Sequence, residues 1–344
     1  KKKTVRKSVI LCGEICNFVN VTLILLDMTN IANAQNPFFE KYTTPHGTVP
    51  FDKIKTEHYE PAIREGISRQ AAEIDTIVNN PETPTFANTI LAYEQSGELL
   101  DRVTTVFGNL RSAETNDDLQ QIAQEMVPLL SEHSNNISLN EALFERIKAV
   151  YLQKDSLGLT PEQMKLLENA YDGFIRRGAN LQGEAKEKYR ELTRELSKLT
   201  LDFSENNLKE TNNYQLALTD KSQLDGLPES AIEAAAETAR EKGVNGWVFT
   251  LHAPSYIPFM TYADNRDLRR ELYMAYNTKC THNNEYNNLE IVKRIVNIHM
   301  EIAQLLGYDN YAEYTLKKRM AETSDAVYTL LNQLLDAYTP TARK

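Results

Sequence analysis

The stretch YRELTRELSKLTLDF, residues 189–203, decides the fold class of this chain. Its large apolar residues recur at intervals of three and four within a charged background: Tyr189, Leu192, Leu196, Leu199 and Phe203. That spacing lines one side of an α-helix, so the stretch is expected to pack on a neighbour along a single stripe. The sequence therefore predicts a long amphipathic helix here.

The same helical periodicity appears in other parts of the chain. Apolar residues step by three or four through two further segments: Ile63, Ile67, Ala71, Ile74 and Ile77, and then Ile291, Ile295, Ile298, Ile302 and Leu305. Thr160-Pro161-Glu162-Gln163 is a capping box with proline at the first helical position, and Gly307 is a helix stop. A last helix over about 323–338 carries apolar residues that need a partner surface: Val327, Leu330, Leu331, Leu334 and Leu335. The chain is therefore predicted to be mainly α-helical.

The segment from about 213 to 263 departs from this pattern. Tyr214–Leu218 alternates weakly between apolar and polar residues, and Trp247–Leu251 is aromatic and β-branched, as strands are. Between them, residues 229–242 form an Ala- and Glu-rich helix closed by Gly243. We therefore expect a small β-sheet inserted in a helical protein. Asp264 is the predicted N-cap of the next helix.

Composition limits the class of protein. The chain has 344 residues, 41% of them hydrophobic and 25% charged, as is usual for a soluble globular protein. Its formal net charge is −10, and no basic face is visible, which argues against nucleic acid as a partner. No internal repeat or low-complexity linker marks a sharp domain boundary.

The N-terminus has the pattern of a secretory signal. A basic start (Lys1, Lys2, Lys3, Arg6 and Lys7) precedes a charge-free run of 12 residues, Ile15–Leu26. This run is shorter than the roughly 20 residues that span a bilayer, and Ala32-Asn33-Ala34 before Gln35 fits a cleavage site. We predict a signal segment over 1–34, a periplasmic or other extracytoplasmic location, and no membrane contact of the mature form. The alternatives are a poorly ordered N-terminal extension and a cytoplasmic protein.

The cysteines are consistent with either location. Cys12 and Cys16 would be removed with the signal segment, which leaves Cys280 alone and allows no internal disulfide. We interpret Cys280 as a small buried hydrophobic residue rather than a nucleophile.

The histidines offer no zinc site of the usual helical kind. A zinc peptidase helix needs two histidines four positions apart, whereas no two of the six here lie closer than 12 positions: His46, His58, His133, His252, His282 and His299. His282 and Glu285 lie one turn apart, but an Asn-rich loop or helix start is the preferred interpretation. Glu132 and His133 are interpreted as a surface pair near a helix end. We find no catalytic, cofactor-binding or metal-binding residue to assign.

Tyrosines concentrate near the predicted sheet and the helix that follows it. They are Tyr256, Tyr262, Tyr273 and Tyr276. They could line a groove, but packing in the core or at its rim is the preferred interpretation.

Several segments, in order, resemble the thimet-oligopeptidase and peptidyl-dipeptidase family of zinc peptidases. Those segments are Val49–Ile54, His58–Ile63, Asp172–Ala179, Leu192–Asn207, Trp247–Leu251, Pro254–Tyr256, Tyr262–Arg266 with Arg269, and Glu301–Tyr314 followed by 316–321. The resemblance runs from about residue 36 to the end, and it is somewhat closer to the peptidyl-dipeptidase branch. His299 is a departure, because arginine is expected there; a histidine satisfied by its neighbours is the simplest explanation.

The resemblance implies a large helical fold in which two halves enclose a channel for short peptides. It also implies zinc in the full-length family, held by a His-Glu-x-x-His helix and a later Glu, none of which this chain contains. The expected organisation is a helical domain with a small sheet over 35–262 and the start of a catalytic domain over 263–344. The chain is expected to bind no zinc, to be inactive alone, and to need the C-terminal half as its partner. The alternative is a non-catalytic helical protein that binds peptides or another partner.

Overall fold

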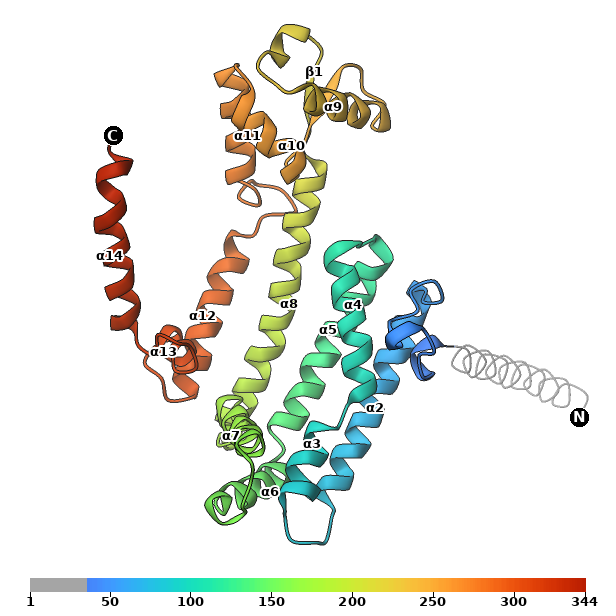
Figure 1. Cartoon of the computed structure of the whole chain (residues 1–344), viewed down its shortest axis with the longest axis vertical. Helices are drawn as coiled ribbons and strands as arrows, with labels where there is room; N and C mark the ends of the chain where they lie inside the picture. The colour runs from blue at the N-terminus through green and yellow to red at the C-terminus, as the bar shows by residue number, and fades with distance from the viewer. Residues whose placement is uncertain (1–35) are drawn as a thin grey trace, which may run out of the picture. The chain divides into compact units, whose positions relative to one another are not determined.

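The computed structural model describes residues 36–344, so the predicted signal segment with Cys12 and Cys16 lies outside the described residues. The chain divides into two compact units, Lys1–Asn180 and Leu181–Lys344, and each is described by itself. The predicted domain boundary at residue 263 stays a prediction. Helices make up most of both units, and the predicted mainly α class is confirmed (Figure 1).

The first unit is a helical bundle. Its helices are α2 (Tyr59–Val78), α3 (Ala92–Glu94), α4 (Glu98–Ala113), α5 (Asp117–Ser138), α6 (Glu141–Tyr151) and α7 (Pro161–Arg176). Short helical turns add η1 (Pro37–Phe39), η2 (Pro45–Gly47), η3 (Thr56–His58), η4 (Phe86–Leu91) and η5 (Lys154–Ser156). Helix α2 packs on α4 and α5, while α6 packs on α7.

The apolar stripe of α2 supplies part of the bundle core. Ile63, Ile74 and Ile77 are buried, which confirms the predicted face, whereas Ala71 is exposed. The capping box before α7 is also confirmed: the Thr160 hydroxyl accepts from the Gln163 N–H, and the Gln163 side chain accepts from the Thr160 N–H. These local patterns fix where α2 and α7 lie in the sequence.

The second unit begins with α8 (Gly183–Asn213), the predicted amphipathic helix. It continues with β1 (Leu216–Leu218), η6 (Lys221–Leu224), α9 (Glu229–Glu241), β2 (Trp247–Phe249), α10 (Ala253–Tyr262), α11 (Arg266–Asn277), α12 (Leu289–Leu305), α13 (Tyr311–Leu316) and α14 (Ser324–Ala342). Helix α12 packs along α8, with Ile298 and Ile302 buried on its stripe. Phe203 is 38% exposed, so it contributes less to the α8 stripe than its spacing predicts.

The small sheet is confirmed as a two-stranded antiparallel pair. Leu216 lies opposite Phe249, and Leu218 lies opposite Trp247. A core forms around the pair from residues of both strands, α9, α10 and α11: Leu216, Leu218, Phe249, Leu251, Phe259 and Leu272. Helix α9 and the connection from β2 to α11 therefore fold against the sheet and not away from it.

The predicted cap of α11 is wrong by one residue. The Asn265 carboxamide oxygen accepts from the Asp267 and Leu268 N–H groups, so Asn265 and not Asp264 is the N-cap. The Asp264 backbone N–H donates to the Asp225 carbonyl at 2.8 Å, which ties it to the turn after η6. Asp and Asn are both good N-cap residues, so the local sequence does not distinguish Asp264 from Asn265. The hydrogen bond from Asp264 to Asp225 holds Asp264 outside the helix and leaves Asn265 as the cap.

Among the described residues, none of the helices combines the length and the apolar character that a membrane crossing requires.

Candidate functional site

The histidines are dispersed through the two units. Among residues 36–344, no group of three or more His, Cys, Asp or Glu side chains is placed to hold a metal ion. Three of the histidines bear on the predictions made from the sequence, and each of these three has contacts within its own unit.

His133 is not a surface residue, contrary to prediction. It is 7% exposed within α5, and its Nε2 lies 2.8 Å from the Gln70 Oε1 of α2. Burial lowers the pKa of His133 below its ordinary value. The packing of α2 on α5 covers this position, and sequence spacing alone does not show which helix faces are covered.

His282 belongs to a polar cluster at the C-terminal end of α8. Its Nδ1 lies 2.7 Å from the Glu210 Oε1, and the Cys280 backbone N–H donates to the Glu210 Oε2 at 2.6 Å. Burial opposes ionisation of Glu210, but the hydrogen bonds from His282 and Cys280 together hold its pKa below the usual range. The cluster fastens the loop after α11 to α8, so the predicted loop position of His282 is confirmed.

Cys280 is buried in this loop, as predicted, with 5% of its surface exposed. Burial and the neighbouring Glu210 raise the pKa of its thiol to about 11. A thiol with this pKa stays protonated near neutral pH, which makes it a poor nucleophile.

His299 lies at the edge of the α12 stripe, where the resemblance leads one to expect arginine. Its ring stacks on Tyr311 with the ring centres 4.1 Å apart. Burial lowers the pKa of His299. The sequence predicts that neighbouring residues satisfy His299, and its stacking on Tyr311 confirms this.

Of the tyrosines near the sheet, Tyr256 and Tyr276 pack as predicted. Tyr256 lies against the sheet core, and Tyr276 stacks on it at the rim with ring centres 4.3 Å apart. Tyr262 at the end of α10 and Tyr273 of α11 are 54% and 49% exposed, which contradicts the packing interpretation for these two.

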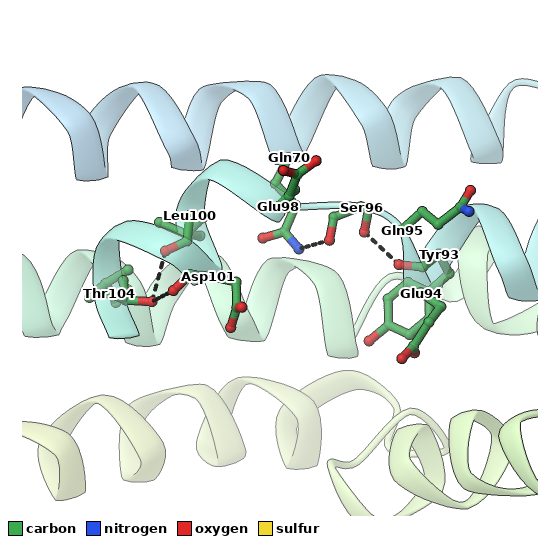
Figure 2. A pocket seen from close by; sticks show the side chains of 11 residues that line it. Gln70, Tyr93, Glu94, Gln95, Ser96, Glu98, Leu100, Asp101 and Thr104 are labelled. Carbon is green, nitrogen blue, oxygen red and sulfur yellow. Dashed lines mark hydrogen bonds between the residues drawn. The ribbon is translucent and has the colours of Figure 1, made fainter. Parts of the chain in front are cut away.

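The first unit contains a pocket of about 840 Å³ that the sequence does not predict. Figure 2 shows its lining, which comes from α2, α3, α4, α5 and the turn between α3 and α4. Two side-chain hydrogen bonds help to hold the turn: Ser96 Oγ donates to the Tyr93 carbonyl at 2.7 Å, and Gln70 Nε2 donates to the Ser96 carbonyl at 3.4 Å. Its only sequence signal is the series Glu94, Glu98 and Asp101, which any solvated helix face also produces.

The chemistry of this pocket is acidic and not catalytic. Glu94, Glu98 and Asp101 are all exposed on its lining, and no Lys, Arg or His is part of that lining. Ser96 lies there too, but its hydroxyl is donated to a backbone carbonyl, and the nearby His133 is bonded to Gln70. The pocket can therefore accept hydrogen bonds from a cationic or amide group, and it lacks a nucleophile activated by a base.

Comparison with known proteins shows which protein family this chain is related to, which the geometry of the fold does not show. Residues 259–344 match the family model described as Peptidase family M3. The dipeptidyl carboxypeptidase of Escherichia coli is 38% identical over 303 residues, which cover 88% of this chain and 44% of that protein.

Other relatives are named oligopeptidase A. The Haemophilus influenzae protein is 32% identical over 87% of this chain and 44% of its own length. The organellar oligopeptidase A of Arabidopsis thaliana is 31% identical over 88% of this chain and 38% of its own length. The chain thus spans less than half the length of these curated relatives. These matches confirm the resemblance seen in the sequence: the chain belongs to peptidase family M3.

Proposed function

We propose that this chain functions as part of a zinc metallopeptidase that removes dipeptides from the free C-termini of short peptides. The observation that carries this proposal is the 38% identity to a dipeptidyl carboxypeptidase over 88% of the chain. Identity to the oligopeptidase A relatives is lower, at 29% to 32%. This difference favours dipeptide release over internal cleavage.

Residues 36–344 do not fit a zinc ion, since no His, Cys, Asp or Glu group among them is arranged to hold one. Zinc in such enzymes lowers the pKa of a bound water to near neutral. We assign this chemistry to the part of the relatives' length that the chain does not match. The contribution of the described residues is to build and support one part of the peptide channel.

The end of the second unit supports this assignment. Helix α14 presents apolar residues that are exposed: Tyr328, Leu330, Leu331, Leu334, Leu335 and Tyr338. They cover a broad arc of one helix face, which is typical of a surface that packs against another element. In our proposal the partner is the C-terminal half of the same peptidase.

The mode of cleavage can be tested with a matched pair of substrates. The whole gene product is incubated with an N-acetylated hexapeptide that has a free C-terminus, and with the same peptide amidated at its C-terminus. A peptidyl-dipeptidase releases the last two residues of the first peptide and leaves the amidated one intact. Equal cleavage of both peptides at an internal bond would assign the protein to the oligopeptidase type instead.

The second candidate function is a non-catalytic binding protein. The exposed apolar face of α14 favours this candidate, because such a face can bind a partner. The two candidates differ in one observation. A whole gene product that binds both hexapeptides without cleaving either, with zinc supplied, would support the binding protein.

We also propose that the protein is exported and that the mature form begins at Gln35, on the basis of the sequence pattern before it. N-terminal sequencing of the protein recovered from cells tests this. A first residue upstream of Ile15 would contradict cleavage.

A further inference from the structure

Helix α11 carries an unusual exposed face. Arg266, Arg270, Tyr273 and Asn277 are exposed, and their spacing of four, three and four places them on one side of the helix. The opposite side holds Leu268, Leu272 and Ala275, which pack on the sheet core. The exposed side is therefore fixed in orientation by the buried one.

Neither arginine is neutralised by a neighbour. Among residues 36–344, no ion pair joins Arg266 or Arg270 to a carboxylate. Glu271 lies roughly 100° around the helix axis from Arg270. Asp267 is closer, three positions before Arg270 and roughly 60° around the axis from it, but the two side chains form no ion pair. By contrast, Arg64 and Arg69 of α2 each bond a glutamate one turn away, at 2.9 Å and 2.8 Å.

The positions of both arginines are unfavourable for the helix itself. Arg266 is the first residue of α11, where the positive end of the helix dipole repels a cation. Arg266 and Arg270 are also like charges four residues apart, a spacing at which they repel each other and destabilise the helix. An anion bound across this face would relieve both repulsions.

The tyrosines extend the same surface. Tyr273 is 49% exposed, and Tyr276 is held in place between the Tyr256 ring and the Lys279 ammonium, whose Nζ lies 4.5 Å from the Tyr276 ring centre. Tyrosine and arginine are the residue types that most often dominate protein interfaces, because they combine apolar contact with directed hydrogen bonds. The face therefore offers both charge and contact area.

We propose that this Arg–Tyr face, defined by Arg266, Arg270, Tyr273 and Tyr276, binds short acidic peptide segments. The arginines lie one helical turn apart, a rise of about 6 Å, and carboxylates on the same side of an extended strand repeat every 6.7 Å or so. A Glu-x-Glu segment can thus give one carboxylate to each guanidinium, and arginine can hold each with two parallel hydrogen bonds.

The size of the face favours a peptide over nucleic acid. From Arg266 to Asn277 the helix rises by roughly 16 Å, which an extended peptide of about five residues covers. Nucleic acid binders depend on many phosphate contacts along a longer basic surface, and the chain as a whole has a net charge of −10. Charge complementarity therefore selects a peptide with few carboxylates.

The test measures binding by fluorescence anisotropy, using a labelled peptide Gly-Glu-Ala-Glu-Ala-Gly that is acetylated and amidated. The double variant R266Q/R270Q should weaken binding by about tenfold or more, because it removes both charge-assisted contacts. Y273A should weaken it less, and Y273F should retain it. The matched control R64Q/R69Q makes the same change of charge on α2, where both arginines are paired, and should bind like the unaltered protein.

Four results would overturn the proposal. They are undiminished binding to R266Q/R270Q, an equal loss in R64Q/R69Q, equal binding of a Gly-Gln-Ala-Gln-Ala-Gly peptide, and tighter binding of a labelled six-residue oligothymidylate. Because the probe is blocked at both ends and only binding is measured, the outcome does not depend on whether the protein is a peptidase.

Discussion

Gly97 shows how a single residue shapes the acidic pocket of the first unit. It precedes α4 in the left-handed region, with φ +79°, and its N–H donates to the Glu73 Oε2 of α2 at 2.7 Å. A Cβ at this position would lie 2.2 Å from the Gln70 Nε2. Backbone conformation and space both require glycine here.

Gly97→Ala should therefore destabilise the chain by about 1–3 kcal/mol in urea unfolding, because strain and a displaced Gln70 add together. Gly108→Ala is the matched control: Gly108 lies inside α4 with nothing within 4 Å of its added Cβ. That change should leave stability unaltered or raise it by up to about 1 kcal/mol. Equal effects of the two substitutions would refute the steric explanation.

His133 makes the stability of the chain depend on pH. Because burial lowers its pKa in the folded state, the unfolded chain takes up a proton first as the pH falls below about 6.5. The contribution of neutral His133 is complete above that pH and is lost as the pH falls towards the lowered folded-state value. His299 acts in the same direction, so His133 accounts for part of the dependence.

His133→Gln should reduce the fall in melting temperature between pH 7.5 and pH 5.5, measured by circular dichroism. His46→Asn is the control, since His46 is exposed and adopts φ +59°, which asparagine tolerates. A fall for His133→Gln as large as that of the His46→Asn control would show that folding does not lower the pKa of His133.

At the scale of elements, α8 and α12 are joined by a clamp around Arg294. Its Nη2 and Nε contact the two carboxylate oxygens of Glu195 at 2.6 Å and 2.7 Å, and its Nη1 contacts Glu301 at 2.7 Å. The hydrogen bond from Arg294 lowers the pKa of Glu195, and the two glutamates raise that of Arg294. The apolar stripe alone does not fix how far the two helices are shifted along their axes. The hydrogen bonds between Arg294 and Glu195 fix that register.

Arg294→Lys keeps the positive charge but loses the planar guanidinium that bonds both oxygens of Glu195. It should lower the free energy of unfolding, measured in urea, by about 1 kcal/mol. The effect is modest because the Arg294 side chain is 35% exposed. Lys293→Gln removes the adjacent, more exposed pair with Glu290 and should have no measurable effect. Equal losses would show that the fork geometry is not what stabilises the helix pair.

Elements that depend on local pattern were predictable from the sequence, and those that depend on distant contacts were not. The stripes of α8 and α12, the capping box before α7 and the strand pair are present as predicted. The cap at Asn265 required the bond from Asp264 to Asp225, and the burial of His133 required α2. The acidic pocket combines residues of four helices, α2 to α5, and the acidic series in the sequence does not distinguish it from a solvated helix face.

At the scale of the whole molecule, α14 presents its apolar residues to solvent. Leu331 and Leu335 are 51% and 62% exposed, which is unusual for leucines that lie one turn apart. The chain alone should therefore self-associate with rising concentration in sedimentation velocity and bind a hydrophobic dye.

The double variant L331E/L335E should be monomeric and dye-negative. Gln333→Glu, which lies roughly 160° around the axis of the same helix from both leucines, should behave like the unaltered chain. If the unaltered chain is monomeric and binds no dye, the face of α14 does not need the partner that we propose for it.

Metal-dependent cleavage is the most direct test of the proposed peptidase. The chain Lys1–Lys344 and the whole gene product are compared on a quenched peptide with a free C-terminus, and the zinc content of each is measured. We predict one zinc per molecule and chelator-sensitive release of a dipeptide for the whole product, with neither property in the chain alone. Stoichiometric zinc and matching activity in the chain alone, or neither in the whole product, would contradict the proposal.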